Sequence, residues 1–293
     1  MIDQPLACGV LGAIRVEAGG RAMKIAAPRQ RALLALLLLD ANRTVSSSTL
    51  IDGIWGETPP QHPESALHIV ICRLRHVLGP VAPLLARDSA GYRIEIATHE
   101  LDVTRAEAHA VEARRALDAN DPRRASAAFD AALTCWTGAP LADVTTFPFY
   151  DAASRRLDQF QLELVESRNT AYLRCGRHLE VLPDIEKWIA ANPWRERLRA
   201  HQMVALYRSG RQIEALAAYD DLRRLLLDDF GIDPHDDVRR LQSRILSGDP
   251  TLLDNGYMAP TVPDLVLDDE SLDIDYESRR GTWTDVITAP RRA

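Results

Sequence analysis

Apolar and polar positions near the start of the chain alternate in three short runs. The runs occupy residues 8–11, 14–17 and 22–25, and glycines separate them. Alternation with a period of two is typical of strands that bury one face, and glycine favours the tight turns between such strands. The pattern therefore predicts a small antiparallel sheet of two or three strands.

Three helical patterns and a hairpin follow this sheet. Residues 29–40 are rich in Leu and Ala and predict a buried helix, residues 50–55 predict a short helix behind a run of serines, and residues 64–78 predict a third. Residues 84–87 and 92–96 predict the two strands of the hairpin. This order of elements is that of a winged helix, a helix-turn-helix variant whose hairpin lies beside the recognition helix.

The third predicted helix has an apolar stripe and a polar face when it is drawn at about 100° per residue. The stripe must face the core, and it consists of Leu67, Ile71, Leu74 and Leu78. The outward face and its flanks hold Ser65, His68, Ile69, Cys72, Arg73, Arg75 and His76. In a major groove Arg73 could bond guanine O6 and N7, and Ile69 could contact a thymine methyl group. The histidines and Arg75 could approach phosphates, whereas the alternative is a solvated face that binds nothing.

The predicted hairpin offers one further cation. Arg87 could enter a minor groove as a wing contact, or it could pair with Asp88 or Glu95. Trp55 and Tyr92 are expected to anchor the core rather than to stack on bases.

Residues 102–246 are helical in pattern and contain a repeat. The segments 172–180 and 206–214 align at an offset of 34 residues, with identical residues at Arg174/Arg208, Gly176/Gly210, Arg177/Arg211 and Glu180/Glu214. An offset of about 34 residues is the tetratricopeptide period, with one helix-turn-helix per repeat. The sequence therefore predicts three parts: a winged helix over 1–100, a tetratricopeptide-like all-α domain over 101–247 and a tail over 248–293. The fold class is mainly α with a small α+β N-terminal part.

The tail combines prolines with a mixture of acidic and apolar residues, a composition that favours disorder. It holds 10 acidic and 4 basic residues, whereas residues 1–100 hold 9 and 10, so most of the formal charge of −7 belongs to the tail. The tail could fold back on a basic face, contact a partner or remain a solvated end. The acidic total therefore does not exclude a nucleic-acid partner for the first 100 residues.

Several classes of protein are not favoured. The chain has neither an apolar run long enough to span a membrane nor a secretory signal near Met1, so we expect a cytoplasmic protein. The four cysteines are far apart and predict reduced, mostly buried thiols rather than a zinc site or a disulfide framework. No cofactor, metal site or catalytic constellation is predicted, since the chain has no glycine-rich phosphate loop and no metal-ligand spacing.

Several motifs carry a family resemblance. They are Pro28-Arg-Gln-Arg-Ala-Leu-Leu, Leu50-Ile-Asp-Gly-Ile-Trp-Gly56, Gly91-Tyr92-Arg93, Trp136-Thr-Gly-Ala-Pro-Leu-Ala-Asp143 and Phe230-Gly-Ile-Asp-Pro234. In this order they resemble the Streptomyces antibiotic regulatory protein (SARP) family. Its members have an OmpR-type winged helix followed by a bacterial transcriptional activator domain.

The resemblance implies a DNA-binding transcriptional activator of a secondary-metabolite gene cluster, such as one for antibiotic biosynthesis. Such a protein binds direct repeats near a promoter, recruits RNA polymerase holoenzyme with its sigma factor, and self-associates on DNA. The resemblance places Arg73 at the base-reading position with Ile69 and Val70 beside it, Arg75 at a phosphate, and Arg87 in the wing, where Arg93 also lies. Cys72 stands where OmpR-type relatives often hold a polar or basic residue.

Two other functions use the same elements. The tetratricopeptide-like domain could make the chain a protein-interaction adaptor, since helical solenoids bind peptides. A repressor could also use the same DNA-binding fold, because the sign of regulation is not encoded in the helix that reads DNA.

Overall fold

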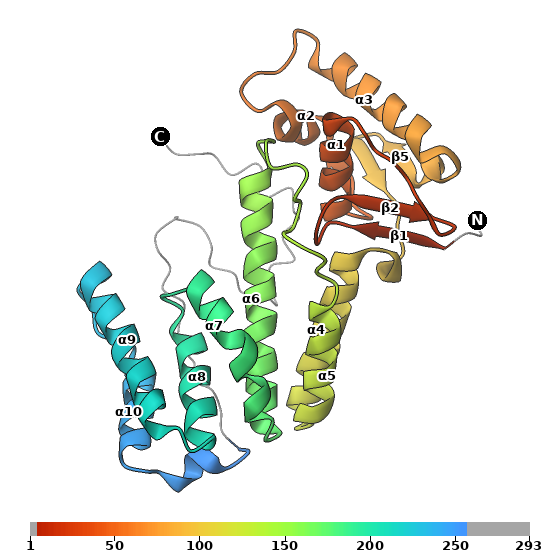
Figure 1. Cartoon of the computed structure of the whole chain (residues 1–293). Coiled ribbons are helices and arrows are strands. Elements are labelled where there is room, and N and C mark those ends of the chain that lie inside the picture. The colour runs from red at the N-terminus through yellow and green to blue at the C-terminus, as the bar shows by residue number, and fades with distance from the viewer. Residues whose placement is uncertain (1–4, 257–293) are drawn as a thin grey trace. The chain divides into compact units, whose positions relative to one another are not determined.

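The computed structural model describes residues 5–256, which form two compact units. The first unit contains residues 5–108 and 132–161, and the second contains residues 109–131 and 162–256. The boundary between them falls inside three helices: α4 (Asp102–Asp118), α5 (Pro122–Leu133) and α6 (Tyr150–Arg174). Helices dominate the described residues and the strands lie in the first unit, which confirms the predicted fold class (Figure 1).

The first unit begins with the predicted small sheet. Its antiparallel strands are β1 (Leu6–Gly9), β2 (Arg15–Ala18) and β3 (Arg21–Ala22), in that order. The first strand begins and ends two residues earlier than the alternation predicted. The reason is that Val10 and Leu11, although fully buried, leave the ladder and donate their backbone N–H groups to the carboxylate of Asp102.

The winged helix follows in the predicted order. Its elements are α1 (Pro28–Leu39), β4 (Val45–Ser46), α2 (Ser47–Trp55), α3 (Pro63–Leu78), the 3-10 helix η1 (Gly79–Leu84), β5 (Leu85–Asp88) and β6 (Gly91–Ile94). The second sheet has the order β4-β6-β5, so β4 adds a third strand to the predicted hairpin. Every residue of α1 from Ala32 to Leu39 is buried, and α2 and α3 both pack against α1 (Figure 1).

A joint connects the sheet of the first unit to residues beyond the winged helix. Asp102 begins α4 and is 1% exposed; its carboxylate accepts hydrogen bonds from Val10 N (2.9 Å), Leu11 N (3.1 Å) and Val103 N (2.8 Å). Arg15 lies 3.6 Å from the same carboxylate. Burial raises the pKa of Asp102, while the three N–H groups and Arg15 act in the opposite direction.

The loop after α5 completes this joint. Thr137 N donates to Leu11 O (2.8 Å) and Leu141 N donates to Val10 O (3.0 Å). Asp143 accepts from Ile14 N (2.9 Å) and pairs with Arg31 of α1 (3.1 Å). The Trp136–Asp143 motif of the sequence analysis therefore acts as a strap along the β1–β2 connection.

In the second unit, α8 (Glu196–Arg208) is the central helix. It packs against α7 (Leu182–Ala191), α9 (Gln212–Phe230) and α10 (Asp236–Leu246), as well as two short 3-10 helices, η3 (His178–Glu180) and η4 (Pro250–Leu253). His201 of α8 is fully buried and its Nε2 lies 3.0 Å from Thr170 Oγ1. Burial lowers the pKa of His201 to about 3, so the ring is neutral in the folded protein.

The two repeat segments have matching structures. Gly176 and Gly210 both have a φ of 75°, a left-handed conformation that glycine adopts without strain. Immediately after each glycine an arginine pairs with a glutamate three residues later, Arg177 with Glu180 and Arg211 with Glu214. The identities found at an offset of 34 residues therefore specify one turn structure, used twice.

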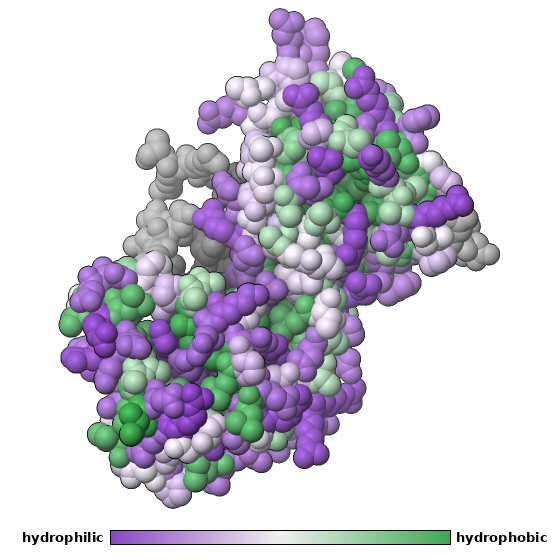
Figure 2. All heavy atoms as spheres, viewed as in Figure 1, coloured by the Kyte–Doolittle hydropathy of each residue, from purple (hydrophilic) through white to green (hydrophobic). Residues whose placement is uncertain are grey.

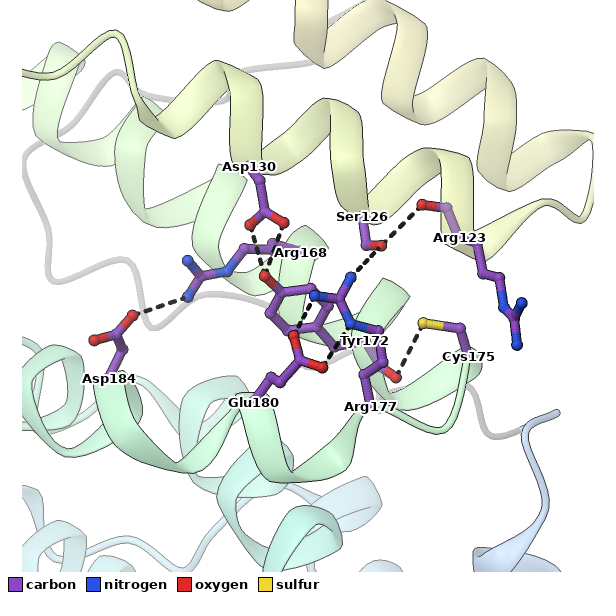
Figure 3. A network of polar contacts seen from close by, with 9 residues as sticks. All are labelled: Arg123, Ser126, Asp130, Arg168, Tyr172, Cys175, Arg177, Glu180 and Asp184. Atoms are coloured by element: carbon purple, nitrogen blue, oxygen red, sulfur yellow. Dashed lines mark hydrogen bonds and ion pairs between the residues drawn. The ribbon is translucent and has the colours of Figure 1, made fainter.

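In the first of these turns, Arg177 also joins a polar network between α5 and α6 (Figure 3). Its guanidinium lies 4.3 Å from the ring centroid of Tyr172 and donates to Ser126 Oγ (3.1 Å). The Tyr172 hydroxyl donates to both carboxylate oxygens of Asp130 (2.7 and 2.9 Å). Burial is the main cause that raises the pKa of Tyr172 to about 12, so the hydroxyl keeps its proton.

Residues 248–256 differ from the predicted disordered tail because they are folded. Arg244 pairs with Asp249 (2.7 Å), which also caps η4 by accepting from Thr251 N (2.9 Å). Arg208 donates to the carbonyls of Leu252 (2.7 Å) and Asp254. The composition of this stretch did not reveal the Arg208 contacts, because Arg208 is distant in sequence from Leu252 and Asp254. The rest of the predicted tail, residues 257–293, lies outside the described residues.

Candidate nucleic-acid interface

The recognition helix predicted over 64–78 is α3, and local sequence signals set its ends. Pro63 occupies the first turn, where its missing N–H is not needed, and Glu64 lies beside the positive end of the helix dipole. Arg75 and His76 lie in the last turn, and Gly79 ends the helix with a φ of 48°. The predicted stripe of Leu67, Ile71, Leu74 and Leu78 is buried, which fixes the face that α3 turns away from the core.

The outward face of α3 carries the side chains that the sequence analysis placed there. They are exposed at Ser65, His68, Ile69, Cys72, Arg73 and His76. Ile69 is 50% exposed, and Val70 lies beside it, half-buried. Among the described residues Arg73 has neither a hydrogen-bond nor an ion-pair partner. Its guanidinium is therefore available to a ligand.

His68 and Cys72 lie one turn apart on this face. The thiol and His68 Nε2 are 3.4 Å apart, so the two side chains contact each other rather than extending separately. Cys72 is exposed, Cys8 and Cys135 are buried, and Cys175 is intermediate. Burial raises the pKa of Cys8 to about 12 and also raises that of Cys135, so these two thiols stay protonated.

Arg75 has a structural role that sequence reasoning missed. It is half-buried, and its Nε and Nη2 atoms both donate to the carbonyl oxygen of Leu85, at 3.2 and 2.9 Å. These bonds attach the last turn of α3 to the first strand of the wing. The phosphate contact predicted for Arg75 stays a prediction, and it would have to be made while the side chain holds β5.

The wing is the hairpin of β5 and β6, and Gly91 fixes it against β4. A Cβ atom on Gly91 would lie 2.0 Å from Val45 O, so only glycine permits this strand pairing. Arg87 is exposed and lies 6.0 Å from the ring centroid of Tyr92, which is itself buried. Arg87 therefore stacks on Tyr92 and pairs with no carboxylate within residues 5–256, whereas Arg93 pairs with Glu95 (2.6 Å).

Asp88 at the wing tip is committed to local contacts. It accepts from Thr44 Oγ1 (2.8 Å) and Ser89 N (2.6 Å), and these hydrogen bonds, the Thr44 bond first, lower the pKa of Asp88. Arg43 precedes Thr44 and is exposed, and its side chain has no hydrogen-bond or ion-pair partner among the described residues. Sequence reasoning missed Arg43 because its nearness to the wing depends on pairing of β4 with β6, which no local pattern encodes.

The described residues include no candidate metal centre and one segment with the length and composition of a membrane span. Within residues 5–256 no group of three or more His, Cys, Asp or Glu side chains could hold a metal ion. Among the same residues, only 63–84 are long and apolar enough to cross a membrane by length and composition. That stretch is α3 followed by η1, and the buried stripe of α3 is its apolar side.

Two family models match the chain. Residues 23–94 match the C-terminal domain of transcriptional regulatory proteins, and residues 101–246 match the bacterial transcriptional activator domain. A winged helix with an outward basic face, followed by such a helical domain, defines a class of winged-helix transcriptional regulators.

The individual similarities give the family. The chain is 43% identical over 245 residues to the regulatory protein AfsR of Streptomyces coelicolor. This match covers 83% of the chain but only 24% of AfsR. It is 32% identical over 267 residues to DnrI of Streptomyces peucetius, covering 88% of the chain and 98% of DnrI. The chain therefore belongs to the Streptomyces antibiotic regulatory protein family, as its motifs predicted.

A solved structure supports the same assignment. The structure of Mycobacterium tuberculosis EmbR in complex with a low affinity phosphopeptide matches with a TM-score of 0.81 and 32% identity. The match covers 85% of the chain described here and 66% of EmbR. The chain thus spans about a quarter of AfsR, two thirds of EmbR and nearly all of DnrI.

Proposed function

We propose that this protein is a sequence-specific DNA-binding transcriptional regulator in which α3 enters the major groove and the β5–β6 wing contacts the backbone or the minor groove. The observation that carries the proposal is the position of Arg73. It lies on the outward face of a helix whose opposite face is buried, and it is exposed without a partner among the described residues. An arginine in this position can form two hydrogen bonds to one guanine.

The surrounding side chains have graded roles in this proposal. Ile69 and Val70 supply apolar contacts to base edges next to Arg73. His68, Cys72, His76 and Ser65 are polar neighbours, and Arg43, Arg87 and Arg93 are cations at or near the wing. Arg75 contributes mainly by fixing β5 to α3. Base readout therefore depends on few residues, whereas phosphate contacts are distributed.

At the level of the whole protein, we propose an activator of a secondary-metabolite gene cluster. Residues 1–100 would bind direct repeats near the promoter, and residues 101–247 would serve self-association on DNA and contact with RNA polymerase holoenzyme, including its sigma factor. The similarity to AfsR and DnrI, both named regulatory proteins, supports this role. It also favours a non-enzymatic protein that acts in the cytoplasm, where its DNA target lies.

The test is a footprint of the purified full chain on the promoter nearest its own gene, at two salt concentrations. We expect a protected repeated site, and we expect Arg73→Ala to lose about 1–3 kcal/mol of discrimination at one base pair of each repeat. Arg240→Ala, which removes an exposed arginine of α10, is the matched control. Equal affinity and equal sequence preference of Arg73→Ala and the parent would contradict the groove assignment.

A further inference from the structure

The outward side of α9 carries exposed apolar side chains among its charged ones. The residues that face inward, Ala215, Ala218, Tyr219, Leu222 and Leu226, are buried, and α9 packs on α8 and α10. The opposite stripe consists of Ile213, Ala217, Asp220, Arg224 and Leu227, and Gly231 follows it at the end of the helix. We call these six residues the α9 face.

The α9 face exposes large apolar side chains. Ile213 is 85% exposed and Leu227 is 50% exposed, and the two charged residues of the α9 face, Asp220 and Arg224, lie between them. Along the side of the unit formed by α9 and α10, apolar and polar residues lie next to one another (Figure 2). With Ala217, these side chains give the α9 face apolar positions on both sides of its two charged residues.

The order of residues along the α9 face is self-complementary. From the N-terminal end it reads large apolar, small apolar, acidic, basic, large apolar and glycine. Reversed and laid against itself, it places Ile213 opposite Gly231, Ala217 opposite Leu227 and Asp220 opposite Arg224. Each large side chain thus meets a small one, and each charge meets its opposite.

The local geometry suits this pairing. Around Gly231 no atom lies within 4 Å of the position of an added Cβ, so the surface is open there for an incoming side chain. Asp220 has no hydrogen-bond or ion-pair partner among the described residues. Among the described residues, Arg224 pairs only with Asp221, three residues earlier (3.3 Å), and both side chains are well exposed. The pair can therefore reorient at little cost.

We propose that the α9 face is a homodimer contact in which it packs antiparallel against the α9 face of a second copy of this chain. The contact is isologous, so each pairing occurs twice about the two-fold axis: Asp220 with Arg224, Ile213 with Gly231, and Ala217 with Leu227. Small residues opposite large ones allow ridges of one helix to enter grooves of the other. The contact goes beyond the self-association on direct repeats in the proposed function, because direct repeats place two copies head to tail whereas this contact has a two-fold axis.

The experiment uses charge reversal in the full chain without DNA. Asp220→Arg places two arginines opposite each other at both symmetry-related contacts, and Arg224→Asp does the same with two aspartates. We expect each single variant to weaken the dimer about tenfold or more in sedimentation equilibrium. The double variant Asp220→Arg/Arg224→Asp restores opposite charges and should recover the parental dissociation constant. A mixture of the two single variants should form a heterodimer, because both contacts are then attractive.

Arg240→Asp is the matched control. Arg240 is 71% exposed and pairs with an aspartate three residues earlier, as Arg224 does at 69% exposure, but it belongs to α10. Its reversal should leave association unchanged. A parent that stays monomeric would overturn the proposal, and so would single variants that dimerise like the parent. A double variant that does not regain dimerisation, or a mixture of the single variants that forms no heterodimer, would also overturn it. An isologous contact between Asp220 and Arg224 requires both results. None of these outcomes depends on DNA, so the footprint experiment remains an independent test of the proposed function.

Discussion

The joint of the first unit and the outward face of α3 use charged side chains in opposite ways. At the joint, Asp102 is 1% exposed and accepts backbone N–H groups from Val10, just after β1, and from Val103 of its own helix. On α3, Arg73 is exposed and has no partner among the described residues. A buried charge with all its partners in place fixes the chain, whereas an exposed one without partners is available for binding. Substitutions at the first site should therefore change stability, and those at the second should change recognition.

The largest expected effect is at the joint. Asp102→Ala leaves the buried N–H groups of Val10 and Leu11 without an acceptor, and it removes the carboxylate that pairs with Arg15. We expect the first unit to lose about 3–5 kcal/mol of unfolding free energy, measured by denaturant titration. Asp118→Ala, an exposed aspartate near the end of the same helix, should change stability by less than about 0.5 kcal/mol. A loss below about 1 kcal/mol for Asp102→Ala would show that the joint is not a determinant of stability.

The second unit offers a buried polar group that responds to pH. His201 has a folded pKa of about 3 and an ordinary value of 6.5, so the unfolded chain binds the proton more tightly. Its contribution to stability is complete above pH 6.5 and decreases as the pH falls toward 3. Between pH 7 and pH 5 this should remove about 2 kcal/mol, since the folded ring stays neutral throughout. The measurement is the pH dependence of unfolding for the parent and for His201→Gln. If the unfolding free energy of the parent and of His201→Gln changed equally between pH 7 and pH 5, His201 would not be the cause of the pH dependence.

The elements that sequence predicted well are those specified by local pattern. The stripe of α3 is visible in the spacing of Leu67, Ile71, Leu74 and Leu78. Residues at this spacing lie on one side of a helix, so one buried side accounts for all four. Likewise, the 34-residue offset located both glycine turns, since a left-handed residue must recur at each one. Arg73 could be placed outward for the same reason. Its contact with a base is a prediction that stands on that placement.

Long-range contacts could not be predicted in this way. Val10 and Leu11 look like strand residues, yet the partner that removes them from the ladder, Asp102, lies some ninety positions away. Arg75 looks like a phosphate-binding cation, but its guanidinium is attached to Leu85 O. The folded structure of residues 248–256 likewise includes a hydrogen bond from Arg208, which is distant in sequence. A single sequence shows which side chains are charged, but not which of them have found a partner.

Substitutions of Arg73 and Arg75 compare, within one helix, a charged side chain without a partner among the described residues and one that has a partner. Arg75→Ala removes two hydrogen bonds to Leu85 O and should lower the unfolding free energy by about 1–3 kcal/mol. Arg73→Ala removes no contact among the described residues, so its effect on stability should be within about 0.5 kcal/mol. Thermal unfolding of the two variants is the measurement. Equal melting temperatures for both would mean that the Arg75 bonds are not stabilising, and would return Arg75 to the phosphate role predicted from sequence.

The smallest effect is expected at Arg43, whose position beside the wing became visible only through the pairing of β4 with β6. If Arg43 contacts a phosphate, Arg43→Ala should weaken binding of all DNA sequences alike and reduce the slope of log K against log salt by about 1. Stability should be unchanged, since the Arg43 side chain has no hydrogen-bond or ion-pair partner among the described residues. The measurement is a salt titration of affinity for the footprinted site and for unrelated DNA. A loss confined to the specific site would instead make Arg43 a base-reading residue, and an unchanged slope would remove it from the interface.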